Sequence, residues 1–181
     1  MSIYDIPVRR IDGKEASLKD YKGDVLLVVN VASKCGLTPQ YEALEKTFQS
    51  YRDKGFKVLG FPANNFAGQE PGSDAEIQDF CSTTFDVDFP MFSKISVQGA
   101  DRHPLYKELI AEHPGRTNKP DSQLKKILDE RGLASKNETD VMWNFEKFLV
   151  SRDGKVVGRF APDIAPDDPA ITGAIERELS A

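Results

Sequence analysis

The residue best suited to chemistry in this chain is Cys35, a thiol in a short polar turn with Lys34 and Gly36 beside it. The turn leads into a predicted helix, whose N-terminus carries about half a positive charge and favours a neighbouring anion. Lys34 adds a full positive charge, and Gly36 lets backbone approach without a side chain. A thiolate is the nucleophilic form of cysteine. Many free cysteines are simply small buried hydrophobes, but a position in a turn favours a reactive thiol.

The elements on either side must position this thiol. Val25–Val31 is almost wholly apolar, which is typical of a strand buried on both faces. The following segment predicts a helix with Thr38 as N-cap and Pro39 at the first helical position. Apolar residues then recur at spacings of three and four, as on a helix that packs one face on a sheet; they are Tyr41, Leu44, Phe48 and Tyr51.

A second loop that could lie near Cys35 follows the next predicted strand, Phe56–Phe61. Strand, helix and strand form a right-handed βαβ unit, so the two strands are parallel neighbours and their carboxyl ends share one edge of the sheet. Ligands of open α/β sheets bind along that edge. Asn64, Asn65 and Gln69 in the loop could therefore donate hydrogen bonds to the thiolate or to a bound oxygen. Asparagine also stabilises turns by itself, and the residues alone do not separate these alternatives.

The second cysteine, Cys81, lies on a helix predicted to begin at Ser73, because Ser73 and Glu76 have the spacing of a capping box. Ile77 and Cys81 share an apolar face with Phe80, which favours a buried core residue. The functional alternative is a second redox cysteine. That role requires the helix to loosen, because a disulfide needs Cα atoms within about 7 Å.

The remaining chain predicts further elements of one domain spanning residues 1–181, without repeats or composition breaks. A small hairpin is expected near the N-terminus, around Asp12 and Gly13, and a clearer one joins Val141–Val150 to Lys155–Phe160. Helices are expected over 104–112, 122–131 and 166–179. The second of these helices either packs on its own domain, which we favour, or forms an oligomer contact.

Composition narrows the function classes. A net charge of −5 gives no basic footprint for nucleic acid or an anionic membrane. No stretch has the apolar length of a signal peptide or membrane span, so the expected location is cytoplasmic. In a reducing compartment the two cysteines are expected to be free or transiently paired. With two histidines and no close cysteine pair, neither a metal site nor another cofactor is expected.

Three stretches resemble the glutathione peroxidase family: residues 30–38 (NVASKCGLT), residues 60–72 from GFP to QEPG, and residues 143–149 (WNFEKFL). The resemblance covers about residues 4–170, in the order and spacing of the family. It implies an α/β, thioredoxin-like fold with a mixed central sheet flanked by helices and an added N-terminal β-hairpin. It also implies an antioxidant enzyme, a thiol peroxidase that acts in the response to oxidative stress.

The resemblance assigns roles to individual residues. Cys35 matches the peroxidatic position, with cysteine in place of selenocysteine, and Gln69, Trp143 and Asn144 match the positions that hydrogen-bond the reactive sulfur. From the residues alone, Trp143 would be read as core packing. Many cysteine-type relatives carry a cysteine where this chain has Ala63 and a glutamine where it has Asn65. Cys81 matches the resolving cysteine of thioredoxin-dependent members.

The resulting hypothesis is a peroxidase acting on hydrogen peroxide and organic hydroperoxides. Cys35 becomes a sulfenic acid, Cys81 resolves it, and thioredoxin reduces the disulfide. Recycling by glutathione is the alternative to thioredoxin. A peroxide sensor that passes oxidation to a partner protein shares the first step. A general thiol–disulfide exchanger is disfavoured, because no C-x-x-C pair stands at the helix start.

Overall fold

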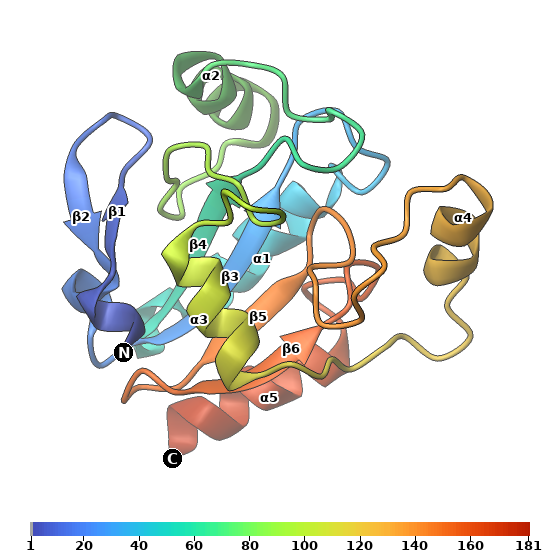
Figure 1. Cartoon of the computed structure of the whole chain (residues 1–181). Coiled ribbons are helices and arrows are strands. Elements are labelled where there is room, and N and C mark those ends of the chain that lie inside the picture. Colours follow the sequence, from blue (N-terminus) through green and yellow to red (C-terminus); the bar gives the residue numbers. More distant parts are fainter. Residues whose placement is uncertain (1) are drawn as a thin grey trace.

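The computed structural model describes residues 2–181 and places a four-stranded mixed sheet at the centre of the protein (Figure 1). Strand β3 pairs in parallel with β4 and antiparallel with β5, which pairs antiparallel with β6. The order across the sheet is β4 (Phe56–Pro62), β3 (Val25–Val31), β5 (Lys147–Val150) and β6 (Val156–Phe160). The parallel β3–β4 pair is the one that the βαβ pattern predicts.

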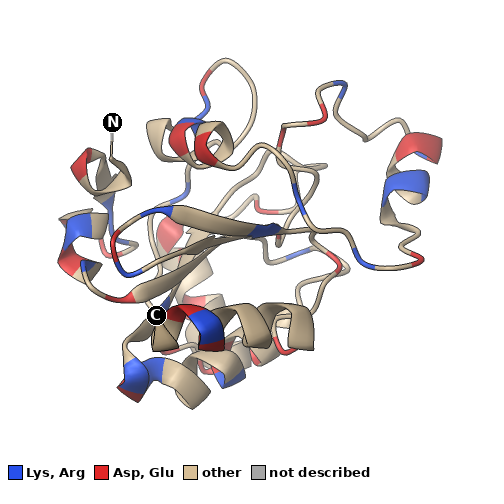
Figure 2. Ribbon diagram, turned by 90° about the horizontal axis from the view of Figure 1, so that it is seen from below, with Lys and Arg blue, Asp and Glu red and all other residues tan. Residues whose placement is uncertain are grey.

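Helices cover both faces of this sheet, with α3 on one face and α1 and α5 on the other (Figures 1 and 2). The helices are α1 (Gln40–Tyr51), α2 (Asp74–Phe85), α3 (Pro104–Glu112), α4 (Leu124–Glu130) and α5 (Pro169–Ser180). Short 3₁₀ turns are η1 (Ile3–Asp5), η2 (Leu18–Tyr21) and η3 (Arg52–Lys54). The N-terminal hairpin pairs β1 (Pro7–Arg9) with β2 (Glu15–Ser17), as predicted. Figure 2 shows acidic and basic residues interspersed along the chain.

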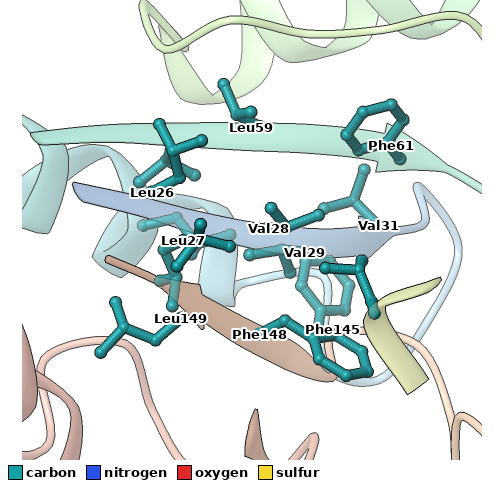
Figure 3. Close-up of a cluster of buried hydrophobic side chains, with 14 of the residues drawn as sticks. Leu26, Leu27, Val28, Val29, Val31, Leu59, Phe61, Phe145, Phe148 and Leu149 are labelled. Carbon is teal, nitrogen blue, oxygen red and sulfur yellow. The ribbon is translucent and has the colours of Figure 1, made fainter. Parts of the chain in front are cut away.

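The hydrophobic core is built around β3, whose seven residues are all fully buried. Figure 3 shows its side chains between those of β4 and β5. Phe61 on β4 stacks on Phe92 with ring centroids 4.5 Å apart. Burial of β3 on both faces explains its unbroken apolar sequence. The loop after this strand, which carries Cys35, therefore starts from the fully buried centre of the sheet.

Helix α1 begins later than the sequence pattern predicts, so the assignment of Thr38 as N-cap is wrong. The first helical residue is Gln40, and Pro39 occupies the N-cap position without a side-chain cap. A turn precedes the helix, with the Thr38 N–H donating to the carbonyl of Cys35 at 3.0 Å. The Thr38 hydroxyl bonds within the Cys35 loop instead of capping the helix.

The strand predicted from Val141 begins only at Lys147. The six residues before it turn, because Phe145 adopts a left-handed backbone with φ of 69°, a costly conformation for an aromatic residue. Its N–H donates to the carbonyl of Asn30 on β3 at 2.6 Å. This contact bends residues 143–145, which we call the WNF segment, across the carboxyl end of β3. An extended strand could not reach this position.

The other predicted elements are present with modest changes. Helix α3 has the predicted bounds, and α2 begins with the predicted capping box between Ser73 and Glu76. Helix α4 is shorter than the expected 122–131 and lies away from the sheet (Figure 1). Its partly exposed Ile127 lies on the outer side, while Leu128 is buried.

Candidate active site

The Cys35 loop is held by its own hydrogen bonds. The Cys35 N–H donates to the Thr38 hydroxyl at 2.9 Å, and that hydroxyl donates to the carbonyl of Ala32 at 2.8 Å. The sulfur accepts the N–H of Leu37 at 3.3 Å. Cys35 is 8% exposed, so it is buried but not completely covered.

The loop after β4 places Gln69 next to the Cys35 turn. The Lys34 N–H donates to the Gln69 carbonyl at 3.0 Å, which ties this loop to the Cys35 turn. Immediately before Gln69 the backbone turns through two left-handed residues, Ala67 with φ of 56° and Gly68 with φ of 62°. Asn64 accepts the N–H of Glu70 at 2.9 Å and closes the turn.

The WNF segment supplies the remaining predicted site residues. The Asn144 side chain donates to the Gln69 amide oxygen at 2.9 Å, and the Trp143 ring packs on Phe66 with centroids 5.4 Å apart. Asn30 on β3 donates to the Trp143 carbonyl at 3.1 Å. Three segments far apart in sequence thus meet at the carboxyl end of β3, and they bring Gln69, Trp143 and Asn144 together beside the Cys35 turn.

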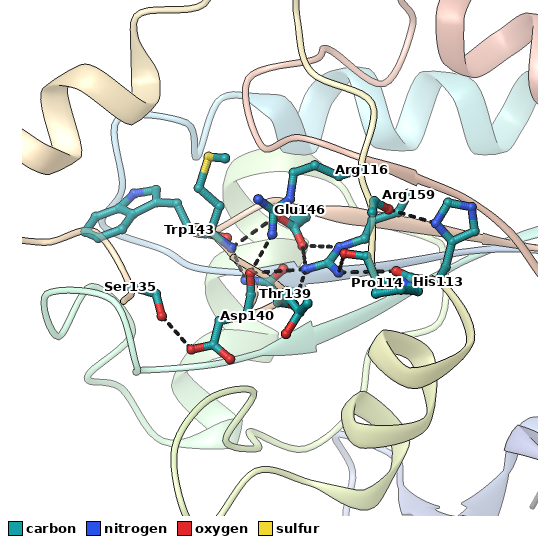
Figure 4. Close-up of polar contacts among 12 residues, drawn as sticks. His113, Pro114, Arg116, Ser135, Thr139, Asp140, Trp143, Glu146 and Arg159 are labelled. Carbon is teal, nitrogen blue, oxygen red and sulfur yellow. Dashed lines mark hydrogen bonds and ion pairs between the residues drawn. The ribbon is translucent and has the colours of Figure 1, made fainter. Parts of the chain in front are cut away.

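A buried ion-pair network, which we call the Glu146–Arg159 cluster, supports the WNF segment on the side away from Cys35 (Figure 4). Both of its side chains are fully buried, and two guanidinium nitrogens of Arg159 lie 2.8 Å from Glu146 Oε2. Arg159 donates further to four backbone carbonyls, those of His113, Pro114, Thr139 and Asp140. Glu146 also accepts the Met142 N–H, and its other oxygen lies 3.0 Å from Arg116 Nε. Such a paired and hydrogen-bonded charge cluster fixes one arrangement of the segments that it joins.

Lys147 anchors the opposite end of the turn. Its buried Nζ donates to the carbonyls of Pro162 and Ile164 and to the Gln40 side chain, at 2.6–2.9 Å. Burial lowers the pKa of Lys147 to about 7, and the negative charges of Asp163 and Glu146 oppose that shift. The lysine connects β5 to the first residue of α1, so it helps fix where the helix begins.

Cys81 lies apart from these residues, on the inner face of α2, and it is 2% exposed. Burial raises the pKa of its thiol to about 11; the nearby Tyr41 hydroxyl lowers it and the charge of Glu70 raises it further. Both cysteines are free thiols. The prediction that Cys81 sits on a buried apolar face is confirmed, and its redox role stays a prediction.

Asn64 and Asn65 serve their own loop rather than the sulfur. Asn65 bonds to Ser96 and to the backbone of Val97, as turn chemistry predicts. Sequence reasoning missed the charged residues behind the site, Glu146, Lys147 and Arg159. A signal was present: Glu and Lys interrupt an otherwise apolar strand at FEKFLV, and a buried charge needs a buried partner.

Two kinds of feature are missing from residues 2–181. No helix there is both long and apolar enough to cross a membrane. No three histidine, cysteine or acidic side chains in the same range gather in a way that could hold a metal ion.

Comparison with known proteins shows which family the chain belongs to. The family model described as glutathione peroxidase matches residues 3–110. The chain is 52% identical over 179 residues to the thioredoxin/glutathione peroxidase BtuE of Escherichia coli, covering 99% of this chain and 98% of that protein. It is 44% identical to the hydroperoxy fatty acid reductase gpx1 of Synechocystis, covering 98% of this chain and 96% of that protein.

A solved structure has a similar fold. The crystal structure of T. cruzi GPX1 superposes with a TM-score of 0.72 at 34% identity, covering 100% of this chain and 98% of that one. The thioredoxin-like fold that the resemblance implies, with its mixed sheet, flanking helices and N-terminal hairpin, is confirmed. The chain therefore belongs to the glutathione peroxidase family and is a thiol peroxidase.

Proposed function

We propose that Cys35 is the peroxidatic residue and that its thiolate attacks the O–O bond of a peroxide. The sulfur becomes a sulfenic acid, and the other oxygen leaves as water or alcohol. The observation that carries the proposal is the hydrogen bond between the Gln69 and Asn144 side chains beside a cysteine whose sulfur already accepts a backbone N–H. Gln69, Asn144 and the indole N–H of Trp143 are the donors that hold the thiolate and orient the peroxide.

Cys81 then resolves the sulfenic acid. For this the first turns of α2 loosen, the two sulfurs form a disulfide, and an external dithiol reduces it by exchange. Thioredoxin is the proposed reductant, and the name of the Escherichia coli relative includes both thioredoxin and glutathione. Direct reduction of the Cys35 sulfenic acid by glutathione is the alternative, and it does not require Cys81.

The proposed substrates are hydrogen peroxide and organic hydroperoxides. The Synechocystis relative, named as a hydroperoxy fatty acid reductase, supports the organic class. The proposed setting is a cytoplasmic antioxidant role in oxidative stress, carried out by one domain over residues 1–181.

The test is NADPH-coupled peroxide reduction with either thioredoxin and its reductase or glutathione and its reductase. Cys35→Ser is expected to abolish turnover with both. Cys81→Ser is expected to abolish turnover with thioredoxin, because a lone sulfenic acid offers no disulfide for exchange. Thioredoxin-linked turnover that is unchanged in Cys81→Ser would exclude the resolving role. The chain has only these two cysteines, so each variant isolates one sulfur.

A further inference from the structure

Glu70, the residue after Gln69, is a buried carboxyl that none of the contacts above uses. Its side chain is fully buried, and neither carboxyl oxygen has a well-aligned hydrogen-bond donor among the described residues, although the Ser33 hydroxyl and N–H lie near enough to lower its pKa. The buried hydroxyl of Ser33 has no hydrogen-bond partner in that part of the chain either. Burying a charged group without a partner is unfavourable, so a carboxyl kept in this state is expected to have a use.

The groups around Glu70 come from both sulfur-bearing segments. Ser33 and Lys34, in the Cys35 turn, face it from one side, and Lys94 faces it from the irregular segment after α2. From α2 and α1 it is close enough for its charge to act on the Cys81 thiol and the Tyr41 hydroxyl.

The space beside the carboxyl opens toward both segments. A hollow of about 360 Å³ is lined by Ser33, Lys34 and Glu70 on one side and by Ile77 and Phe80 of α2 on the other. This is the space between the turn that carries Cys35 and the helix that carries Cys81. Glu70 therefore lies on the wall of this hollow, between the two sulfur-bearing segments.

We propose that Glu70 is a proton carrier in disulfide formation: its carboxylate accepts the Cys81 thiol proton and passes it to the oxygen that leaves Cys35. This inference rests on the proposed function, because it requires a Cys35 sulfenic acid and resolution by Cys81. The stated atoms balance. The S–H bond of Cys81 and the S–O bond of Cys35 break, and an S–S bond forms.

The remaining product is water, formed from the leaving hydroxide and the proton that Glu70 carries. The Cys81 sulfur is oxidised and the Cys35 sulfur is reduced from its sulfenic state, so no outside oxidant or reductant takes part. The carboxylate is regenerated for the next turnover.

Electrostatics explains why this carrier suits this thiol. The attacking species must be a thiolate, and Cys81 is held as a thiol by burial and by the charge of Glu70. A thiolate forming beside a carboxylate would place two negative charges together. Transfer of the proton onto Glu70 neutralises the carboxylate as the thiolate forms. Burial raises the pKa of Glu70, with Ser33, Lys94 and Lys34 opposing, which brings it nearer to the working pH of a general base.

The experiment is a single turnover with one equivalent of hydrogen peroxide and no reductant, quenched at intervals between pH 5.5 and 9. Sulfenic acid is measured by dimedone trapping and disulfide by intact mass. Glu70→Gln is compared with the wild type and with Asp79→Asn, which removes an exposed carboxylate from the same helix α2. Thermal unfolding and the near-ultraviolet signal of Trp143 verify that each variant is folded.

In Glu70→Gln we expect disulfide formation to slow by about 100-fold, within the range of general acid–base catalysis, so that sulfenic acid accumulates. Glu70→Asp should recover part of the rate, and Asp79→Asn should behave as the wild type. Disulfide formation in the wild type should reach a plateau once Glu70 is ionised. In Glu70→Gln it should rise with pH throughout, because hydroxide then removes the proton.

Disulfide formation in Glu70→Gln at the wild-type rate near pH 7 would overturn the proposal. Should Glu70→Gln fail to fold, the wild-type profile decides by itself: a tenfold rise per pH unit across the whole range would exclude Glu70 as the base. A wild type that forms no sulfenic acid, or forms one without a later disulfide, would instead refute the proposed function. The two failures are therefore distinguishable.

Discussion

The two sides of the Cys35 turn are equally buried but very differently bonded. Behind Trp143 and Asn144, the Glu146–Arg159 cluster pairs its charges and bonds four backbone carbonyls. On the side of Cys81, the hydroxyls of Ser33 and Tyr41 and both oxygens of Glu70 lack oxygen or nitrogen partners among the described residues. On the first side Glu146, Arg116 and Arg159 are paired, although Asn30 Oδ1 and Asn144 Oδ1 lack a hydrogen-bond partner among the described residues. On the other side the carboxyl itself is the unpaired group.

Helices α2 and α3 also differ in how many of their residues are buried. Helix α2 buries only two of its 12 residues, Ile77 and Cys81, whereas α3 buries four of nine. Low burial and unsatisfied polar groups are the marks of a segment that opens at low cost. For the proposed function, in which Cys81 resolves Cys35, this arrangement would separate two needs: a fixed set of donors around the first sulfur and a movable helix that carries the second.

The largest expected effect lies on the fixed side. Glu146→Gln leaves Arg159 buried without its counter-charge, and breaking a buried pair in this way costs about 3–5 kcal/mol. Urea unfolding should show this loss. The matched control, Asp129→Asn, removes the exposed Lys125–Asp129 pair, which is worth about 0.5 kcal/mol or less. Equal small losses in both variants would contradict the idea that the Glu146–Arg159 cluster fixes the site.

The next effect concerns Lys147. In Lys147→Met the Ile164 carbonyl and the Gln40 amide oxygen lose their donor, and we expect a loss of about 2 kcal/mol in the free energy of unfolding. Burial lowers the pKa of Lys147 to about 7, so above that pH the native state binds fewer protons than the unfolded chain. Wild-type stability then gains with rising pH up to the ordinary lysine pKa.

The difference between Lys147→Met and the wild type should therefore widen from pH 7 to 9. Urea unfolding of both proteins across this range measures it. A constant difference would mean that the buried amine keeps its charge over the whole range.

Local sequence patterns predicted most of the fold, because β3, α3 and the α2 capping box each depend on neighbouring residues. Two boundaries escaped for a tertiary reason. Thr38 has the composition of a helix cap, but its hydroxyl is used by Cys35 and Ala32. Val141 begins an apolar run, but the bond from Phe145 to Asn30 bends the chain before a strand can start.

The residues of the candidate site also differ in whether the local sequence could predict them. Cys35 could be selected from its turn alone, and Gln69 was one of three candidate donors in the loop after the second strand, whereas Trp143 and Asn144 were proposed only through family resemblance. Their meeting depends on the bond between Gln69 and Asn144, which are 75 positions apart. Glu70 lies within the QEPG stretch that resembles the family, but nothing in the sequence indicates its burial without a partner, which is a property of the packed structure.

A smaller effect is expected on the movable side. Ser73→Ala removes the side-chain cap of α2, worth about 1 kcal/mol. In a Cys35→Ser background, alkylation of the remaining Cys81 should become about fivefold faster, since opening of α2 exposes it. Ser50→Ala, on the outer face of α1, is the control and should leave the rate unchanged. If both variants react like the parent, exposure of Cys81 does not pass through the start of α2.

The smallest effect separates two glutamates six positions apart. Burial raises the pKa of Glu70, so the native protein loses stability as pH rises from the ordinary glutamate pKa through the raised one. Bonds from Ser73 lower the pKa of the exposed Glu76, so its contribution is present above the ordinary pKa and is lost as pH falls. Relative to the wild type, Glu70→Gln should therefore become more stable with rising pH and Glu76→Gln less stable. Urea unfolding measures the Glu76 slope below the ordinary glutamate pKa and the Glu70 slope above it, so the range must extend from about pH 3 to 8. Slopes of the same sign would show that the Glu70 carboxyl is solvated when the protein is folded, which would remove the contrast between the two sides of the site.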